Sequence, residues 1–428
     1  MKKNIKKFIP NFIIGIYHWC WALLGAIIFR FPSNKLIVIG ITGTKGKSST
    51  IYLLGKILES AGYQVGCISS MSIKVGGEET LNPYHMTMPG RLVIQKYLRK
   101  ILNANCKYAL VEVTSEGIMQ HRHAFINFDM AVFTNLAPEH IEAHGSFDKY
   151  MHAKGKLFKA LESSKKKNKI SVINLDDLAS DYFLSFKADT KIGFRFENED
   201  SDKVSQIIRP SEYALSSFGS QFLLNGITIN LCLPGLFNLY NALAAISTAL
   251  SRGVPIEVCK KAIELVAEIP GRMEKIEAGQ NFSVIVDLAH TPESFKQVLA
   301  ETKKNTTKSL ICVFGSAGGG RDKWKRPELG KIASNFCQKI ILTNEDPYDE
   351  DALEIIAQIE SGIGKTFSKE AVNKIADRQM AINEAIKNAQ SGDTVIVLGK
   401  GTETSMVLGS KNIPWDDREV IRLAIKNR

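Results

Sequence analysis

Short apolar, β-branched runs alternate along the chain with segments in which apolar residues recur every three or four positions. The run KLIVIGIT (35–42) predicts a strand, and the segment 48–63 that follows predicts a helix. Its apolar residues at helical spacing are Ile51, Leu54, Ile57 and Leu58. The same order returns in SVIVDLAHTPESFKQVLAE, residues 283–301. Alternation of strand and helix predicts an α/β protein with parallel sheets.

Length and pattern divide the chain into three predicted parts. At 428 residues it is too long for one ordinary domain. We expect an apolar N-terminal segment at 1–35, a central parallel-sheet domain at 36–269 and a doubly wound α/β domain at 270–428. Within the central domain, residues 207–233 alternate between polar and apolar positions and contain two glycines that suit turns. This pattern predicts a small antiparallel excursion, a short antiparallel sheet inserted in the domain.

The N-terminal segment departs from this pattern. No formally charged residue stands between Phe12 and Phe29, and the stretch contains Trp19 and Trp21. The basic residues that bracket it are Lys2, Lys3, Lys6, Lys7 and Arg30. It has about the minimum length of a membrane span, and its flanks also suit a helix in the membrane interface. We predict association with the inner face of the cell membrane, with a helix docked on the protein as the alternative.

The balance of charged residues excludes few classes of binding partner. Lys and Arg outnumber Asp and Glu by 55 to 44, a formal net charge of +11 that suits nucleic acid, anionic lipid or anionic metabolites. The excess is diffuse, and its densest cluster, at 163–169, is typical of a solvated loop, so we predict no nucleic-acid partner. Seven cysteines without a Cys-x-x-Cys pair indicate neither a zinc site nor a disulfide framework and suit the cytoplasm.

The stretch GITGTKGKSST (40–50) joins the first predicted strand to its helix. In the common phosphate-binding loop, Gly-x-x-x-x-Gly-Lys-Ser/Thr, backbone N–H groups surround phosphate oxygens, the lysine reaches the outer phosphates and the hydroxyl ligates Mg²⁺. Gly46, Lys47 and Ser48 fit this pattern, but the first glycine is displaced to Gly43. The helix N-terminus adds its positive dipole end. The central domain is therefore predicted to be a P-loop ATPase.

Two further strands are predicted, one within segment 107–117 and one at the start of segment 129–145, and polar residues follow each of them. Glu112 stands near the end of the first, and His140 follows the second. Ligands of open α/β sheets bind outside the carboxyl ends of the strands, so both side chains could converge on the loop. A carboxylate and an imidazole would make a Mg²⁺ or Mn²⁺ site between ATP and a second substrate. Spacing alone is weak support, because a histidine after a strand is more often an ordinary loop residue.

Nine segments, in order, carry a family resemblance. They are TGTKGKSS, EVTSEGIMQHR, FTNLAPEHIEAHGSFDKYMHAKGKLF, INLDD, LPGLFNLYNALAA, PGRMEKI, VIVDLAHTPES, GGGRDKWKRPELGKIA and GKGTE. Together they resemble the Mur ligases over about residues 36–428. The resemblance is strongest to the branch that adds the third residue of the peptidoglycan stem peptide to UDP-N-acetylmuramoyl-dipeptide. The displaced glycine is that family's own form of the P-loop.

The resemblance implies an ADP-forming ligase that uses ATP and Mg²⁺ to join a UDP-muramoyl-dipeptide to a free amino acid. ATP would convert the substrate carboxylate to an acyl phosphate, from which the amine displaces phosphate. Catalytic roles fall to Lys47, His140 and Lys154, the last matching a family lysine that is carbamylated. Ser48, Glu112, His140 and Lys154 would hold Mg²⁺. The loop residues implied to bind ATP are Gly43, Thr44, Gly46, Lys47, Ser48 and Ser49.

Four further matches would complete the nucleotide site. Asn238 and Asn241 of FNLYN would lie near adenine. Arg272 of GRME would offer a positive fork to phosphate, and Asp287 of VDLAH would accept from ribose hydroxyls. Because the last two fall in the C-terminal domain, the resemblance implies that two lobes close on the nucleotide.

For the muramoyl-dipeptide, the residues that match the family's contacts are Thr87, Thr114, Gln120 and Arg122. The family often has two threonines where this chain has MTMP. Met88 cannot donate a hydrogen bond, so that contact is in doubt.

The pocket for the incoming amino acid departs most from the family. Diaminopimelate ligases usually carry Asp-Asn-Pro-Arg where this chain has EDPY, so Tyr348 replaces an arginine that would pair with the distal carboxylate. The acidic neighbours favour a side chain with only a positive charge, which predicts lysine or ornithine rather than diaminopimelate. Arg321 and Lys323 of GGRDKWKRP leave open an anionic group on the incoming amino acid. The implied pocket residues are Arg321, Glu345, Asp346, Pro347, Tyr348, Gly399 and Glu403.

Several alternatives stay open. The usual ligase of this branch has an N-terminal domain that grips UDP, whereas this chain has only about 36 residues there, so the acceptor could be lipid-linked. Folylpolyglutamate synthases, cyanophycin synthetases and a lipid-acting amidotransferase partner share the ATP lobes. As an alternative that is not an enzyme, the chain could be a membrane-tethered, non-catalytic ATP-binding module. Lys47, Glu112, His140 and Lys154 weigh against that module, because clustered groups of this kind indicate chemistry.

Overall fold

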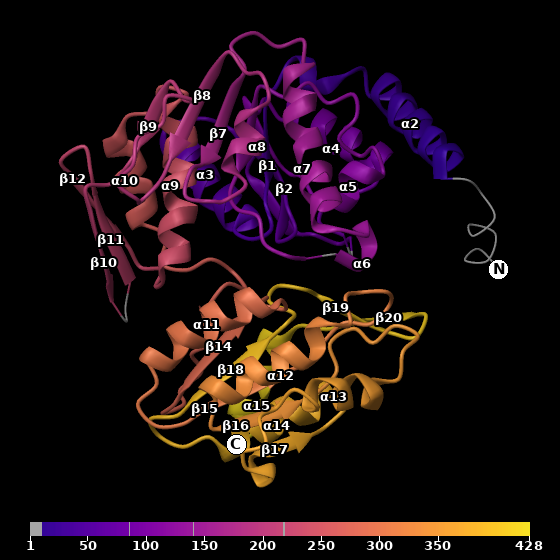
Figure 1. Cartoon of the computed structure of the whole chain (residues 1–428), viewed down its shortest axis with the longest axis vertical. Helices are drawn as coiled ribbons and strands as arrows, with labels where there is room; N and C mark the ends of the chain where they lie inside the picture. Colours follow the sequence, from indigo (N-terminus) through magenta and orange to yellow (C-terminus); the bar gives the residue numbers. More distant parts are fainter. Residues whose placement is uncertain (1–10, 85, 140, 217–218) are drawn as a thin grey trace. The chain divides into compact units, whose positions relative to one another are not determined.

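The computed structural model describes residues 11–84, 86–139, 141–216 and 219–428. The chain divides into two compact units, coloured mainly indigo to pink and orange to yellow in Figure 1. The first comprises 1–137 and 147–267, and the second comprises 138–146 and 268–428. Each contains a mainly parallel sheet with helices, which confirms the predicted α/β class.

A nine-stranded sheet organises the first unit, in the order β4-β3-β2-β5-β1-β6-β7-β8-β9. The seven strands from β2 to β9 in this order run parallel, and β3 and β4 are antiparallel additions at one edge. Central strands β5, β6 and β7 are buried at every position, as expected for parallel strands covered on both faces. The strands are β1 (Ile37–Thr42), β2 (Val65–Ile68), β3 (Ser72–Val75), β4 (Glu78–Leu81), β5 (Tyr108–Glu112), β6 (Met130–Phe133), β7 (Ile170–Asn174), β8 (Thr190–Phe194) and β9 (Gln206–Ile208).

Helices cover this sheet on two sides. One group, α3, α9 and α10, packs together. The other group, α4, α7 and α8, shares a core with β1, β5 and β6 that contains Val38, Val111, Phe133, Leu157 and Phe183. The helices are α3 (Lys47–Ser60), α4 (Arg91–Asn103), α5 (Ser115–Met119), α7 (Phe147–Glu162), α8 (Ser180–Leu184), α9 (Leu236–Leu250) and α10 (Ile256–Glu264).

The predicted antiparallel excursion is present as a separate three-stranded sheet. Its strands are β10 (Glu212–Ser216), β11 (Gly219–Leu224) and β12 (Ile227–Leu231). Gly226, with φ of 76°, forms the turn between β11 and β12. Glycine suits this turn because it adopts positive φ without steric cost.

The N-terminal segment forms α2 (Asn11–Ile28), followed by a short 3₁₀ turn at Pro32–Asn34, and α2 packs on α4. Ala22 and Ala26 are buried at this contact, and a Cβ on Gly25 would lie 3.2 Å from the α4 backbone. Arg99 of α4 donates two hydrogen bonds to the carbonyl of Phe29, at 3.0 and 2.7 Å. One side of α2 is thus docked on the protein. Among the described residues, no helix is both long enough and apolar enough to cross a membrane.

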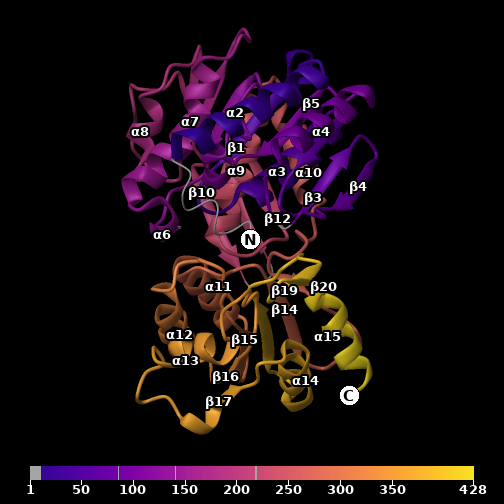
Figure 2. The same cartoon turned by 90° about the vertical axis from the view of Figure 1, so that its right-hand side faces the viewer.

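A six-stranded sheet organises the second unit, in the order β13-β14-β18-β15-β16-β17, with only β13 antiparallel. Figure 2 shows α11, α12 and α13 on one side of it and α14 and α15 on the other. The strands are β13 (Glu274–Lys275), β14 (Ser283–Asp287), β15 (Leu310–Phe314), β16 (Lys339–Leu342), β17 (Val372–Lys374) and β18 (Thr394–Leu398), with a hairpin of β19 (Ser405–Leu408) and β20 (Lys411–Pro414). The helices are α6 (Ile141–His144), α11 (Pro292–Lys304), α12 (Lys325–Phe336), α13 (Ala352–Glu360), α14 (Arg378–Asn388) and α15 (Asp417–Lys426), with a 3₁₀ turn at Lys369–Ala371.

One segment, 138–146, groups with the second unit although the sequence prediction included it in the central domain. Two hydrogen bonds tie α6 to the loop before α12. The N–H of Glu142 donates to Asp322 at 3.0 Å, and the N–H of Lys323 donates to Glu142 at 2.9 Å. The second unit therefore combines segments that lie far apart in the sequence.

A buried ion pair links the loops that follow β16 and β18. Arg378 donates to both carboxylate oxygens of Asp417, at 2.8 and 2.7 Å, and neither side chain is exposed. The same guanidinium donates to the carbonyls of Asn344 and Leu398, each at 2.9 Å. Burial alone would lower the pKa of Arg378, but Asp417 more than offsets this and the pKa is raised.

We expect Asp417→Asn to destabilise the second unit by about 3–5 kcal/mol, because the buried guanidinium loses its compensating charge. Urea unfolding followed by circular dichroism measures the change. The matched control is Glu360→Gln, which breaks a largely exposed pair with Lys374 and should cost about 1 kcal/mol or less. Equal, small losses in both variants would contradict the structural role of the buried pair.

Candidate active site

The P-loop leaves β1 through a turn that requires glycine. Gly43 has a φ of 152° and Gly46 a φ of 80°. A Cβ on Gly43 would lie 2.0 Å from Oγ1 of Thr134, and one on Gly46 would lie 2.2 Å from Oδ1 of Asn241. Ile41, where the common loop has its first glycine, is a buried residue of β1 paired with β5. The displaced glycine follows from a strand that continues past that position.

Asn135, the second residue after β6, fixes the conformation of the loop. Its carbonyl accepts the N–H of Thr44 at 2.8 Å, and its side-chain Oδ1 accepts the N–H of Lys45 at 2.9 Å. The carbonyl of Lys45 accepts from Asn135 Nδ2 at 3.1 Å and from Thr134 at 2.7 Å. The loop is therefore held in place where α3 begins. A helix N-terminus of this kind is a general binding element for phosphate.

Two lysines from different helices reach one backbone oxygen of this loop. Lys47 Nζ donates to the carbonyls of Gly43 and Thr44, at 3.0 and 2.9 Å. Lys154, buried on α7, donates to the same carbonyl of Gly43 at 2.7 Å and lies 4.4 Å from the ring centroid of Tyr150. The positive charge of Lys47 at this position can neutralise the outer phosphates of a nucleotide.

Glu112 is buried at the end of β5, beside the start of α3. Its Oε2 accepts from Ser48 Oγ and from the N–H of Ser70, each at 2.9 Å, and its Oε1 lies 4.0 Å from Lys47 Nζ. Carboxylate and hydroxyl oxygens fit Mg²⁺, which fills the rest of its shell with water and phosphate oxygens. His140, predicted as a further ligand, lies outside the described residues. Within the described residues, no three His, Cys, Asp or Glu side chains gather where a metal could bind.

α9 brings the two asparagines predicted to lie near adenine to the same loop. Asn241 packs against the second loop glycine, and its Nδ2 donates to Asn238 Oδ1 at 3.3 Å. Asn238 in turn donates to the carbonyl of Pro234 at 2.8 Å. The other predicted loop residues, Thr44 and Ser49, are buried. All predicted nucleotide residues of the first unit thus lie around the start of α3.

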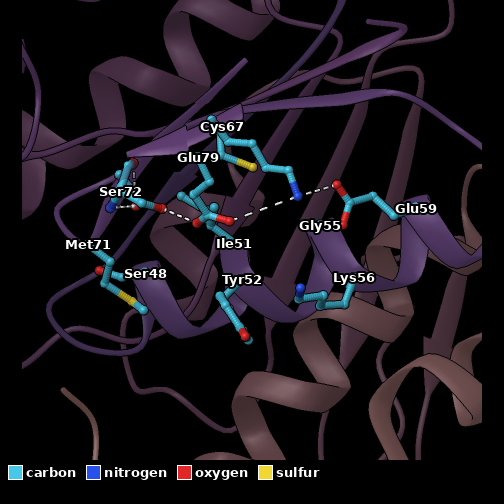
Figure 3. Close-up of a pocket in the computed structure, with 12 residues that line it drawn as sticks. Ser48, Ile51, Tyr52, Gly55, Lys56, Glu59, Cys67, Met71, Ser72 and Glu79 are labelled. Carbon is cyan, nitrogen blue, oxygen red and sulfur yellow. Dashed lines mark hydrogen bonds and ion pairs between the residues drawn. The ribbon is translucent and has the colours of Figure 1, made fainter. Parts of the chain in front are cut away.

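A small pocket lies next to the P-loop, between α3 and the strands β2 and β3 (Figure 3). Ser48 stands at one end, and Lys74 at the other forms ion pairs with Glu59 and Glu79. Burial raises the pKa of the Cys67 thiol in its wall. The cavity volume of about 20 Å³ holds about one water molecule. It is too small for a nucleotide, so we assign no substrate to it.

The predicted contacts for the muramoyl-dipeptide gather around α5. Thr114 caps the helix by accepting a backbone N–H at 3.1 Å. Gln120, at its other end, accepts from Arg122 at 2.8 Å, and Arg122 also donates to the carbonyl of Met88. Burial lowers the pKa of the Arg122 guanidinium. Thr87 is half-buried, whereas Met88 is fully buried in the core, so Met88 is a packing residue.

In the second unit, Asp287 ends β14 at the carboxyl edge of the sheet. Its Oδ2 accepts the N–H of Met273 at 2.8 Å, and its Oδ1 accepts the N–H of Ala289 at 2.6 Å. Arg272, the neighbour of Met273, is half-buried. The two residues predicted for phosphate and ribose therefore lie close together within this unit.

The loops after β16 and β18 carry the predicted amino-acid pocket. Burial raises the pKa of Glu345, and a Cβ on Gly399 would lie 2.5 Å from its Oε2. Asp346 accepts from buried Lys400 at 3.0 and 2.9 Å, and Lys400 also lies 2.7 Å from Glu403. Burial alone would lower the pKa of Lys400, but the two carboxylates more than offset this and raise it. The predicted residues of both loops thus form one cluster.

Tyr348 adopts a φ of 53°, which is uncommon for a residue other than glycine. A glycine run packs against its loop, since a Cβ on Gly319 would lie 2.6 Å from the Tyr348 ring and one on Gly318 would lie 2.3 Å from the carbonyl of Pro347. Burial raises the pKa of Tyr348, and nearby Arg321 only partly opposes this. The structure therefore places Arg321 beside the EDPY loop.

Most acidic side chains around EDPY already have partners. Asp346 pairs with lysine as described, and Glu350 pairs with Arg326 at 3.0 Å and Lys323 at 3.1 Å. Asp351 accepts two backbone N–H groups at the start of α13. The sequence argument that these acids attract a cationic substrate is weakened, because their charge is compensated within the unit.

Comparison with known proteins identifies the family. The Mur ligase middle domain matches residues 41–249, and the Mur ligase, glutamate ligase domain matches residues 271–401. The chain belongs to the Mur ligase family. Members of this family are ATP-dependent, ADP-forming ligases, as the sequence resemblance predicted.

Individual relatives agree with this assignment. The chain is 37% identical to the UDP-N-acetylmuramoyl-L-alanyl-D-glutamate--2,6-diaminopimelate ligase of Caldanaerobacter subterraneus subsp. tengcongensis, over 94% of this chain and 80% of the relative. It is 36% identical to the UDP-N-acetylmuramyl-tripeptide synthetase of Roseiflexus sp., over 97% of this chain and 83% of the relative. A solved structure of a UDP-N-acetylmuramoyl-L-alanyl-D-glutamate--2,6-diaminopimelate ligase is similar with a TM-score of 0.60 and 28% identity, covering 92% of this chain and 78% of that one.

Some residues that shape the site were given no role from the sequence, although Thr134, Asn135 and Tyr150 lie within one of the family segments. Asn135, Thr134, Ser70 and Tyr150 hold the P-loop, Glu112 and Lys154 in place. The position of Asn135 just after a strand was the available signal. Ser70 lies outside all the family segments, and only the fold brings it to Glu112.

Glu112→Gln tests the metal site, because it keeps the shape of the side chain but removes the charge that Mg²⁺ needs. We expect ATP-dependent phosphate release to fall roughly 100-fold or more, as for loss of one preorganised electrostatic group. The Mg²⁺ concentration for half-maximal rate should rise. Glu78→Gln, on the exposed edge strand β4, is the control and should leave both quantities unchanged. A normal rate and Mg²⁺ dependence in Glu112→Gln would exclude the proposed metal ligand.

Proposed function

We propose that the chain adds the third amino acid to UDP-N-acetylmuramoyl-L-Ala-D-Glu in the cytoplasm, through an acyl phosphate formed from ATP. The observation that carries this proposal is the meeting of Lys47 and Lys154 on one side of the P-loop with Ser48 and Glu112 beside it. These are the groups that phosphoryl transfer requires for charge neutralisation and positioning. The names of the relatives supply the acceptor.

Each group has a distinct part in the proposed reaction. Ser48 and Glu112 would hold Mg²⁺, which would supply positive charge to offset the negative charge of the phosphates. Lys47 would bind the outer phosphates. Lys154 would become a metal ligand once carbamylated, because a carbamate is anionic; its position at the Gly43 carbonyl supports a place in the site. Arg272 and Asp287 stay predictions for phosphate and ribose.

For the amino acid, we propose lysine or ornithine. Tyr348 stands where diaminopimelate ligases usually carry arginine, and a phenol cannot form the paired hydrogen bonds that a guanidinium makes with a carboxylate. Of the three proteins compared above, two are named for diaminopimelate and the third names no amino acid. The choice therefore rests on this one position, and it is open to direct measurement.

The reaction itself is tested with purified protein, ATP, Mg²⁺ and UDP-N-acetylmuramoyl-L-Ala-D-Glu, with lysine, ornithine, diaminopimelate and other amino acids supplied singly. We expect phosphate release and a product heavier by one residue with lysine or ornithine. Omitting the amino acid is the control. Absence of phosphate release with every amino acid, together with normal ATP binding, would reject the proposal. It would favour the non-catalytic module or a lipid-linked acceptor.

Tyr348→Arg tests the basis of the amino-acid preference. We expect kcat/KM for diaminopimelate to rise about tenfold or more relative to lysine, the effect of a charged hydrogen-bonded pair. Tyr348→Phe keeps the ring that packs on Gly319 and should leave the preference unchanged. If arginine produces no gain for diaminopimelate, the distal group of the amino acid does not lie at this position.

A further inference from the structure

The side of α2 that faces away from the protein is apolar. Burial along the helix separates an outward face of large residues from an inward face on which Gly15, Ala22, Gly25 and Ala26 lie together with the larger Ile14, His18 and Leu23. The three fully buried positions of this face, Ala22, Gly25 and Ala26, are all small. Exposed side chains on the outward face include Phe12, Ile16, Tyr17, Leu24, Ile27 and Ile28. A surface helix in water normally has the opposite arrangement, with its polar side outward.

This outward face belongs to an ordered part of the first unit. α2 lies along α4 in both views of the chain (Figures 1 and 2), and its end is held by Arg99. Trp19 contacts Phe125 with ring centroids 5.2 Å apart. The exposed apolar residues are therefore presented on a fixed surface. Contiguous apolar surface of this kind marks an interaction site.

The distribution of residue sizes on α2 is that of a helix beside lipid. In membranes, small residues lie where helices pack together and let their backbones approach closely, while large apolar residues face the lipid tails. The close approach of Gly25 to α4 fits the first half of this rule. Tyr17, Trp19 and Trp21 are of the types that are enriched at the boundary between lipid and water.

Charge indicates which kind of surface the face would meet. The first acidic residue along the chain is Glu59, and the sequence before α2 contains Lys2, Lys3, Lys6 and Lys7. The neighbouring α4 carries only basic charges, at Arg91, Lys96, Arg99 and Lys100. Basic residues next to an apolar helix attract anionic lipid headgroups. A second copy of the chain would carry the same positive charge at this face, so the two copies would repel each other.

We propose that the outward face of α2 inserts into the interface of a bilayer that contains anionic lipids and holds the first unit at that surface. The helix lies flat, because its other side remains packed on α4. This inference is independent of the ligase reaction, since none of the residues on the outward face belongs to the candidate active site.

The test is co-sedimentation of the full chain with vesicles of phosphatidylcholine and phosphatidylglycerol, or of phosphatidylcholine alone. We expect binding to the mixed vesicles that weakens at high salt, as screening predicts. The double variant Ile16→Gln/Ile27→Gln should lower the partition coefficient roughly tenfold or more through lost apolar burial. Leu353→Gln/Leu423→Gln is the matched control, because these residues are 62% and 56% exposed, against 57% and 54% for Ile16 and Ile27.

Thermal unfolding and phosphate release show that each variant is folded, and both should match the parent chain. Failure of the parent chain to bind mixed vesicles would overturn the proposal. Equal binding by the α2 variant and the control would overturn it as well, because the face would then not be the point of contact. A dimer in sedimentation velocity that the α2 variant abolishes, without vesicle binding, would assign the face to a second copy and also reject it.

Discussion

The carbonyl oxygen of Gly43 accepts hydrogen bonds from both Lys47 and Lys154, and the nucleotide site depends on this shared acceptor. The two lysines come from α3 and α7, which belong to the two helix groups that cover the central sheet. They can meet only because the chain turns at Gly43 with a φ of 152° and passes so close to Thr134 that a Cβ would not fit. The displaced glycine and the convergence of the lysines are thus consequences of one turn.

Two ammonium groups that donate to one oxygen repel each other. Glu112 supplies a carboxylate 4.0 Å from Lys47 and is itself fixed by Ser48 and Ser70. At a low effective dielectric, charges at such distances interact by several kcal/mol. A phosphate group would relieve the repulsion between the lysines, and the proposed carbamylation of Lys154 would remove it. Charge arranged in this way favours binding of an anion more than it favours stability of the protein alone.

The strongly periodic elements were predictable because both faces of the central sheet are buried. The run at 35–42 contains β1, and the helix expected at 48–63 is α3 (Lys47–Ser60) within a few residues. Segments that depend on distant partners were not predictable. The grouping of 138–146 with the second unit rests on Glu142 and Asp322. Asp346 of EDPY is compensated by Lys400 from another loop, and the nearby Glu350 by Arg326 of α12. A sequence read along one chain shows the charges but not the partners that neutralise them.

The predicted amino-acid pocket depends on distant residues in the same way. The loops after β16 and β18 are joined by Arg378, which bonds the carbonyls directly before Glu345 and Gly399. Because this link is buried and made to backbone atoms, it does not involve the side chain at Tyr348. Under the role proposed for Tyr348, an exchange of its side chain would act on loops that Arg378 holds in place. The position of the loops is a property of distant residues, whereas the proposed preference is local.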